Sequence, residues 1–198
     1  MNKGIALAKG DVIGFLHADD FYAGPRVLAR VAAVFADPAV ACAYGDLVFV
    51  KTSPGAMNGR EDALQLRNGE FFLPDERVVR RWKAGELSAR SFHWGWMPPH
   101  PTFFARRAVY DRLGVFRLDL GTAADYEFML RCLLKQRLIA RYIPEVMVKM
   151  RTGGASNASL KNRLAANRND RKAWKVNGLR PYPWTLWLKP LRKVGQWR

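Results

Sequence analysis

The stretch that decides the fold is DVIGFLHADD, residues 11–20. Its apolar run from Val12 to Leu16 is short and partly β-branched, which is typical of a strand buried on both faces, as in a parallel sheet. The run ends abruptly in two adjacent carboxylates, Asp19 and Asp20. Ligands of α/β proteins bind at such strand ends, where carboxylates hold Mg²⁺ or Mn²⁺ together with substrate phosphates. The alternative is a solvated turn in which Asp20 caps the next helix.

The composition is that of a folded and strongly basic protein. Of the 198 residues, 49% are hydrophobic, and the formal net charge is +16. This apolar content is enough for a core and excludes a disordered chain. No apolar run approaches the roughly 18 residues of a membrane span. Cys42 and Cys132 lie far apart in apolar contexts, which predicts reduced core thiols in a cytosolic protein.

The positive charge is concentrated toward the C-terminus. Residues 151–198 carry 12 Lys or Arg side chains, one acid and four of the seven tryptophans. Apolar residues of the last stretch recur at helical spacing, with basic residues mostly elsewhere: Trp184, Trp187, Leu188, Leu191 and Val194. This pattern predicts an interfacial helix on an anionic membrane surface, kinked at Pro190. The alternative is a helix docked on the protein's own core with a solvated basic edge.

Local signals predict the other elements. Pro74-Asp75-Glu76 favours the start of a helix that leads through Val78, Val79 and Trp82. Phe92 to Pro101 is too rich in Pro and Gly for a regular helix. The periodicities and stop signals predict helices over 25–35, 106–113 and 126–135. They also predict strands over 40–50, interrupted at Gly45-Asp46, over 102–105, and over 138–150, broken at Pro144-Glu145.

Three stretches agree in kind, order and spacing with one known family. They are MNKGIALAKGDVIGFLHADD (1–20), HPTFFARRAVYDRLGVF (100–116) and AADYEFMLR (123–131). Together they resemble the C-terminal part of a family 2 glycosyltransferase with the α/β, Rossmann-like GT-A fold. The closest likeness is to bacterial enzymes that build exopolysaccharide or O-antigen units. The resemblance implies a partial, N-terminally truncated GT-A domain over 1–156 that lacks the first nucleotide-binding strands, and a helical tail over 157–198.

The resemblance also implies a metal site and a catalytic base. The family's metal motif falls on His17, Asp19 and Asp20, with Asp20 as a ligand of Mg²⁺ or Mn²⁺ and Asp19 near the ribose or the metal. His17 stands where Asn or Asp is usual, and a strand-end hydrogen bond is its alternative role. The base position falls on Asp125, which the positive end of a helix favours in its charged form. A plain N-cap is the alternative for Asp125, and Glu127 is the alternative base.

Further residues are implied to contact the two substrates. A flexible loop that closes over the donor diphosphate matches Arg151, Gly153, Gly154 and Ser156, where glycine amides and a guanidinium bind anions. His100 matches a position on the acceptor side. Trp94 and Trp96 are expected either to stack on a sugar or to be packed aromatics.

The reaction implied is metal-assisted transfer of a sugar, with inversion, from a nucleotide-sugar donor to a saccharide acceptor, commonly one that is lipid-linked. Such an enzyme is expected in the cytoplasm, at the inner face of the bacterial plasma membrane. A non-catalytic accessory protein derived from a truncated glycosyltransferase is the main alternative. Binding of nucleic acid is suggested by charge alone, without a recognised motif, and is not expected.

Overall fold

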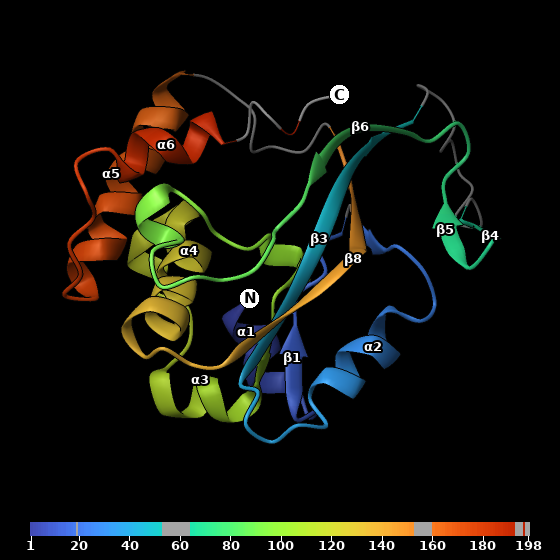
Figure 1. The fold of residues 1–198 in the computed structure, drawn as a ribbon, viewed down its shortest axis with the longest axis horizontal. Helices are drawn as coiled ribbons and strands as arrows, with labels where there is room; N and C mark the ends of the chain where they lie inside the picture. Colours follow the sequence, from blue (N-terminus) through green and yellow to red (C-terminus); the bar gives the residue numbers. More distant parts are fainter. Residues whose placement is uncertain (19, 53–63, 153–159, 193–195, 197–198) are drawn as a thin grey trace.

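The structure is a computed structural model that describes residues 1–18, 20–52, 64–152, 160–192 and 196, with residues 160–165 described by their backbone alone. A long, curled sheet crosses the molecule (Figure 1). Its strands are β1 (Val12–Gly14), β2 (Asp20–Tyr22), β3 (Cys42–Lys51), β6 (Arg77–Trp82), β7 (Phe104–Arg106) and β8 (Ala140–Arg151). A small hairpin pairs β4 (Gln65–Arg67) with β5 (Glu70–Phe72).

Strand β3 is the centre of this sheet. The strand order is β1-β7-β3-β8-β2, and β6 pairs with the second half of β3. β3 and β8 run parallel, whereas the other described ladders of the sheet are antiparallel. The predicted α/β class is therefore confirmed, but the sheet is mixed, and the sequence predicted a parallel one.

Strand β1 differs from its prediction. It ends at Gly14, and among the described residues it pairs with β7 alone. Ile13 is buried, but Leu16 is exposed, so burial on both faces was wrong. The ring of Phe104, opposite Gly14, covers one face so closely that a Cβ added at Gly14 would lie 2.4 Å from it. Strands that would precede residue 1 stay a prediction.

Strand β6 replaces a predicted helix. Asp75 has a positive φ of 54°, which is incompatible with the first turn of an α-helix. The following residues pair instead with β3 over Leu47–Lys51. The guanidinium of Arg80 lies 4.3 Å from the centroid of the Phe49 ring, a cation–π contact that the extended backbone permits. Tertiary pairing thus overrides the local helix signal.

Helices cover both faces of the sheet (Figure 1). The described α-helices are α1 (Asn2–Leu7), α2 (Val27–Val34), α3 (Arg107–Leu113), α4 (Ala124–Met129), α5 (Leu160–Val176) and α6 (Thr185–Leu191). α2 packs on one face through the buried side chains of Val27, Val31 and Phe35. α3 and α4, with the π-helical continuation Leu130–Lys135, pack on the other.

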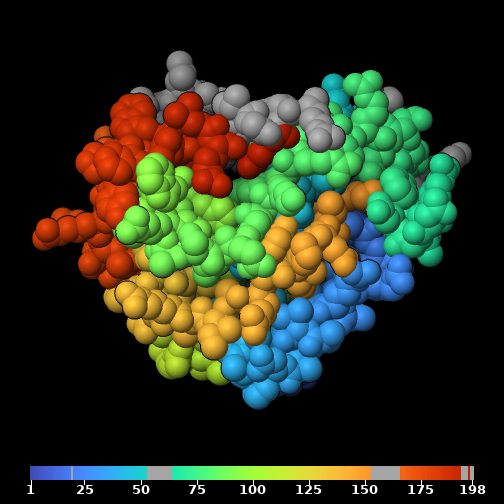
Figure 2. Space-filling model, viewed as in Figure 1, coloured from blue at the N-terminus to red at the C-terminus, as the bar shows by residue number. Residues whose placement is uncertain are grey.

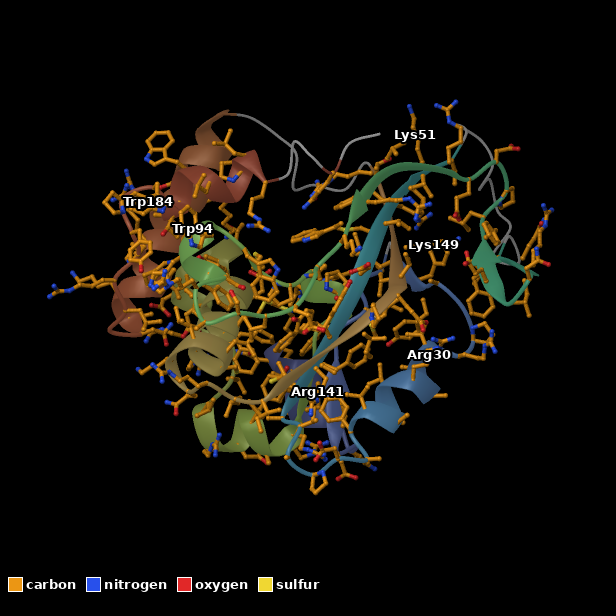
Figure 3. The ribbon with its side chains drawn as sticks, in the orientation of Figure 1. Arg30, Lys51, Trp94, Arg141, Lys149 and Trp184 are labelled. Carbon is orange, nitrogen blue, oxygen red and sulfur yellow. The ribbon has the colours of Figure 1, made fainter. Side chains whose placement is uncertain are left out.

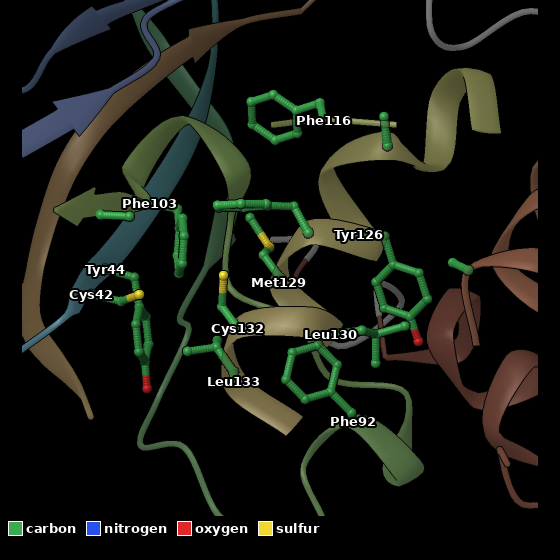
Figure 4. Close-up of a cluster of buried hydrophobic side chains, with 14 of the residues drawn as sticks. Cys42, Tyr44, Phe92, Phe103, Phe116, Tyr126, Met129, Leu130, Cys132 and Leu133 are labelled. Atoms are coloured by element: carbon green, nitrogen blue, oxygen red, sulfur yellow. The ribbon is translucent and has the colours of Figure 1, made fainter. Parts of the chain in front are cut away.

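The larger core lies between β3 and α4 (Figure 4). Both cysteines are free and fully buried in it, so the predicted core thiols are confirmed. A hydrogen bond from the Cys132 side chain, together with burial, raises the pKa of the Cys42 thiol well above its usual range. Such a thiol is unreactive, because the thiolate is the nucleophile.

The C-terminal helices pack on this same core. Ala173 and Trp174 of α5 and Leu186 of α6 are buried members of the cluster. In the space-filling view, the red atoms of α5 and α6 lie directly against the green and yellow atoms of earlier segments (Figure 2). The described helices α5 and α6 therefore share this core with the earlier segments. None of the described helices is long and apolar enough to cross a bilayer.

Candidate active site

Three side chains from distant parts of the sequence gather beyond the end of β1. His17 follows β1, His100 opens the 3₁₀ turn His100–Thr102, and Asp125 lies in the first turn of α4. Nε2 of His17 is 3.4 Å from Nδ1 of His100, and the charge of Asp125 acts on the His100 ring. The fold thus brings together a residue of the predicted metal motif, the predicted acceptor-side residue and the predicted base.

Ring contacts fix the orientation of His100. Phe15 stacks on the imidazole with 5.9 Å between ring centroids, and Phe116 meets it edge-on at 5.9 Å. The two phenylalanines also touch each other, at 5.3 Å. Nε2 of His100 is buried and has no hydrogen-bond partner among the described residues. Buried polar atoms are normally hydrogen-bonded, so Nε2 is an unsatisfied polar atom of this cluster.

The electrostatics keep this imidazole neutral. Burial lowers the pKa of His100 from its ordinary value, the Asp125 carboxylate opposes the shift, and His17 and the N-terminal amine add to it. A neutral ring has one donor and one acceptor nitrogen. His100 can therefore accept from one neighbour and donate to another near pH 7.

We expect the free energy of unfolding to decrease as the pH falls below about 6.5, the ordinary pKa of His. The unfolded chain takes up a proton there, whereas the folded chain, with its lowered His100 pKa, resists protonation. The contribution of His100 to the free energy of unfolding is fully present above its pKa in the unfolded chain. It is lost as the pH falls toward its pKa in the folded chain. Urea unfolding between about pH 5 and pH 8 measures the slope.

His100→Gln should flatten this slope, since the substitution removes the proton-binding group. Burial also lowers the pKa of His93, so His93→Gln should remove a second share of the pH dependence. A His100→Gln protein whose stability falls with acid as steeply as the wild type would contradict the assignment.

Asp125 and Glu127 are engaged differently, although they are two residues apart. Within the described residues, Asp125 accepts one hydrogen bond, from the backbone amide of Tyr126 at 2.7 Å. Glu127 is buried and accepts from Arg131 at 2.9 Å and from Asn177 at 3.2 Å. The Glu127 carboxylate thus ties α4 to the residue that follows α5. Because Arg131 and Asn177 already hold the Glu127 carboxylate, Asp125 is the better candidate for a base.

The C-terminal helices also hold the residue beside Asp125. The indole N–H of Trp174 donates to the Tyr126 hydroxyl at 2.9 Å. The ammonium of Lys189, which pairs with Asp170 at 2.8 Å, lies 3.5 Å from the centroid of the Tyr126 ring. The start of α4 is therefore positioned by side chains about 45 to 65 residues further along the chain. These contacts form only when the chain is packed into its tertiary structure.

The candidate donor-side residues lie at one end of the sheet. Asp20 begins β2 and is paired with Met150, and Arg151 ends β8 beside it. Asp20 is buried, and Arg151 is half-buried. The other residues predicted for this side lie outside the described residues: Asp19, Gly153, Gly154 and Ser156.

The described residues fit only part of the predicted metal site. No group of three His, Cys, Asp or Glu side chains suited to a metal ion occurs in the described part of the chain. His17 is directed toward His100, so we leave it out of the ligand set. Asp20 remains, and a single carboxylate suffices where substrate phosphates and water complete the shell of Mg²⁺.

The two tryptophans proposed for sugar stacking have different environments. Trp96 is buried, and its indole N–H donates to the carbonyl of Ala84 at 2.6 Å. It also meets Tyr44 edge-on in the core, so we leave it out of the proposed site. Trp94 is exposed, but its ring lies against that of Trp184, the residue before α6, with 6.0 Å between the ring centroids (Figure 3).

Sequence reasoning missed Lys149, which lies opposite Phe21 of β2. Its ammonium is buried, pairs with Glu76 at 2.8 Å and lies 3.6 Å from the centroid of the Phe72 ring. It thereby anchors the segment after β5 to β8, the strand that pairs with β2. A single Lys within the otherwise apolar stretch Val146–Met150 was the signal that could have identified it.

Comparisons with known proteins identify the family. Residues 1–114, more than half of the chain, match the model of the family described as Glycosyl transferase family 2. A PGL/p-HBAD biosynthesis glycosyltransferase of Mycobacterium bovis is 28% identical over 159 residues, which cover 79% of this chain and 52% of that protein. The corresponding Mycobacterium tuberculosis protein gives the same values.

A second kind of relative is an uncharacterized glycosyltransferase of Mycobacterium tuberculosis. It is 30% identical over 135 residues, which cover 68% of this chain and 43% of that protein. The chain thus spans about half the length of the curated relatives it matches. The matched family and these relatives name one class of protein: the chain belongs to glycosyltransferase family 2.

Proposed function

We propose that this chain carries the catalytic base and part of the donor site of an inverting glycosyltransferase. Its donor is a nucleotide sugar, and its acceptor is a saccharide, lipid-linked and presented at the inner face of the bacterial plasma membrane. The observation that supports this proposal is the convergence of His17, His100 and Asp125, which come from the three stretches that resemble the family. Membership of the family supports glycosyl transfer in general.

In this reaction the acceptor hydroxyl oxygen attacks the anomeric carbon of the donor. A bond forms between that oxygen and carbon while the bond from the carbon to the diphosphate oxygen breaks. Asp125 takes the proton of the attacking hydroxyl. The nucleoside diphosphate leaves with the electron pair of the broken bond, and the guanidinium of Arg151 offsets its charge.

His100 orients the acceptor in this proposal. Its ring is fixed by Phe15 and Phe116, and its Nε2 is buried without a partner among the described residues. In the proposal, Asp125, whose charge acts on the same ring, takes the proton of a hydroxyl bound to this nitrogen. Positioning of this kind converts two diffusing groups into neighbours, which lowers the barrier of the chemical step.

Asp20 is the proposed protein ligand of Mg²⁺ or Mn²⁺. Such an ion, when bound, neutralises the charge that develops on a departing diphosphate. Asp20 and Arg151 flank the same end of the sheet, which is consistent with a shared diphosphate site.

Asp20→Asn should weaken Mn²⁺ binding at least about tenfold, because it removes a charged oxygen ligand. Calorimetric titration with Mn²⁺ measures the affinity, and thermal unfolding shows whether the buried Asn is tolerated. Asp111→Asn, at an exposed position of α3, is the matched control and should leave the affinity unchanged. Equal affinity in the wild type and Asp20→Asn would eliminate Asp20 as a ligand.

The stereochemical course tests the proposed reaction. Proton NMR of the first product formed from an α-linked donor should show a β-linked sugar, because a single displacement inverts the anomeric carbon. A product that retains the α configuration would contradict single displacement with Asp125 as base.

A further inference from the structure

Exposed aromatic side chains from two separate segments form one surface. Trp94 belongs to the 3₁₀ turn Phe92–Trp94, whereas the others lie in or before α6. Trp184 is the centre, 6.0 Å from Trp94 and 5.2 Å from Tyr182 between ring centroids (Figure 3). We call this set the aromatic surface, with the exposed fraction of each residue: Trp94 48%, Tyr182 38%, Trp184 45%, Trp187 67% and Leu191 60%.

The exposure of these rings follows from how α6 is docked. Thr185 and Leu186 face inward, and the Thr185 hydroxyl donates to the carbonyl of His93 at 2.6 Å. Gly95 lies so close to α6 that a Cβ added there would be 2.5 Å from the backbone nitrogen of Lys189. α6 is therefore held through Thr185 and Leu186 and by the close approach of Gly95. Trp184, Trp187 and Leu191, at spacings of three and four residues, share a face that is turned outward.

Packing of the core does not explain this outward face. Exposed single apolar residues are ordinary, but contiguous exposed patches of large apolar residues mark interaction sites. Trp and Tyr combine a broad apolar ring with a polar N–H or O–H, and this combination is enriched at the boundary between hydrocarbon and water.

The charge around the aromatic surface indicates the sign of the partner. Arg180 and Arg192 flank it in sequence and are exposed, and neither is ion-paired within the described chain. Asp170 is the one acid of residues 160–192, and it is paired with Lys189. An anionic partner is complementary to this surface. A second copy of the same surface is not, because the arginines of the two copies would repel each other.

We infer that the aromatic surface is the site at which this protein lies on an anionic phospholipid bilayer. Trp184, Trp187 and Leu191 enter the headgroup region, and Arg180 and Arg192 contact lipid phosphates. α6 then lies in the plane of the interface, as amphipathic helices do. Trp94 is part of this surface, so its role is in membrane contact. An aliphatic residue among the rings favours lipid over nucleobases, which bind through stacking.

The inference extends the membrane partner named in the proposed function, and it rests on that proposal only for the purpose of the contact. Binding is measured without donor or acceptor, so inactivity in sugar transfer would leave it intact. Conversely, an enzyme that transfers sugar in solution but ignores vesicles would contradict the inference alone.

Co-sedimentation with vesicles of equal parts phosphatidylglycerol and phosphatidylcholine is the test. The wild type should bind these vesicles about tenfold or more tightly than pure phosphatidylcholine vesicles. The Trp184→Ala/Trp187→Ala variant should lose about tenfold or more in affinity, and so should Arg180→Ser/Arg192→Ser. Leu118→Ala, at a residue that is 80% exposed outside the aromatic surface, is the matched control and should bind like the wild type.

Two further measurements keep the test decisive. Trp187→Ser leaves the contact between Trp94 and Trp184 intact, and far-UV circular dichroism verifies that the variant is folded. A loss of vesicle binding in this variant is then not caused by misfolding. Sedimentation velocity tests whether a second copy of the chain, and not a membrane, covers the aromatic surface. A wild type that dimerises, a Trp187→Ser variant that does not, and no vesicle binding by either would assign the surface to a second copy and overturn the inference. Vesicle binding that all variants share would overturn it as well.

Discussion

Asp125→Asn is expected to lower the rate of sugar transfer about 10²–10⁴-fold, the usual contribution of a general base. Asn has nearly the shape of Asp and can keep the oxygen that accepts from the amide of Tyr126, but it cannot take a proton from the acceptor hydroxyl. The proposed donor site near Asp20 and Arg151 is untouched. We therefore expect the turnover number to fall while the affinity for the nucleotide sugar stays within a factor of about three.

Steady-state kinetics with titrated donor, together with calorimetric donor binding, separates these two effects. Asp119→Asn is the control, because Asp119 is an exposed residue just before α4 whose carboxylate pairs with Arg117. That variant should behave like the wild type. An Asp125→Asn enzyme that turns over within about threefold of the wild type would exclude Asp125 as the base.

Trp174→Ala is expected to reduce the free energy of unfolding by about 3–5 kcal/mol, the usual range for removing a buried Trp. The side chain is fully buried in the main core. Its indole N–H also satisfies the Tyr126 hydroxyl, which would lose its partner inside the protein. Since Tyr126 follows Asp125, the same variant should also lower the rate of transfer.

Urea unfolding measures this loss, and Trp187→Ala is the matched control. The Trp187 ring is largely exposed, so its removal should change the free energy of unfolding by no more than about 0.5 kcal/mol. If Trp174→Ala cost less than about 1 kcal/mol, α5 would be an appendage, as a domain boundary at residue 156 implies. A large cost would make the tail part of the folding unit.

Local sequence signals correctly predicted those helices and strands in which tertiary packing favours the same structure as the local sequence. The helix over 25–35, the strand over 40–50 and the helix over 106–113 are all present, as α2, β3 and α3. The two helices each have a clear apolar period and a Pro or Gly stop, so packing reinforces the local preference. β6 was missed because its Arg-rich pattern gains stability from Phe49 on the neighbouring strand, which is about 30 residues away.

The tail shows a different limit of sequence reasoning. The tryptophans of residues 183–198 predicted an amphipathic helix, and α6 forms there. The two residues it buries, however, are Thr185 and Leu186, because the approach of Gly95 decides which side faces inward. The burial of Trp174 in an otherwise polar helix depends on Tyr126, a contact between residues 48 positions apart.

The candidate site could be predicted residue by residue but not as a set. Asp20, His100 and Asp125 were proposed from motifs, each for a separate role. The contact between His17 and His100 joins residues 83 positions apart, and no periodicity reports such a distance. The hydrogen bonds of the Glu127 carboxylate with Arg131 and Asn177 distinguish Glu127 from Asp125. They too are visible only in three dimensions.

The most direct measurement of the central claim is a donor screen by release of nucleoside diphosphate, with and without saccharide and lipid-linked acceptors. It is run with Mn²⁺ on this chain, on a chain extended at its N-terminus, and on the Asp125→Asn form of each. We predict acceptor-dependent release from at least one nucleotide sugar, lost in the matching Asp125→Asn form. Two results would contradict the account. One is acceptor-dependent release that the Asp125→Asn forms retain. The other is release that, with every donor and in both chains, does not exceed the release by the matching Asp125→Asn form.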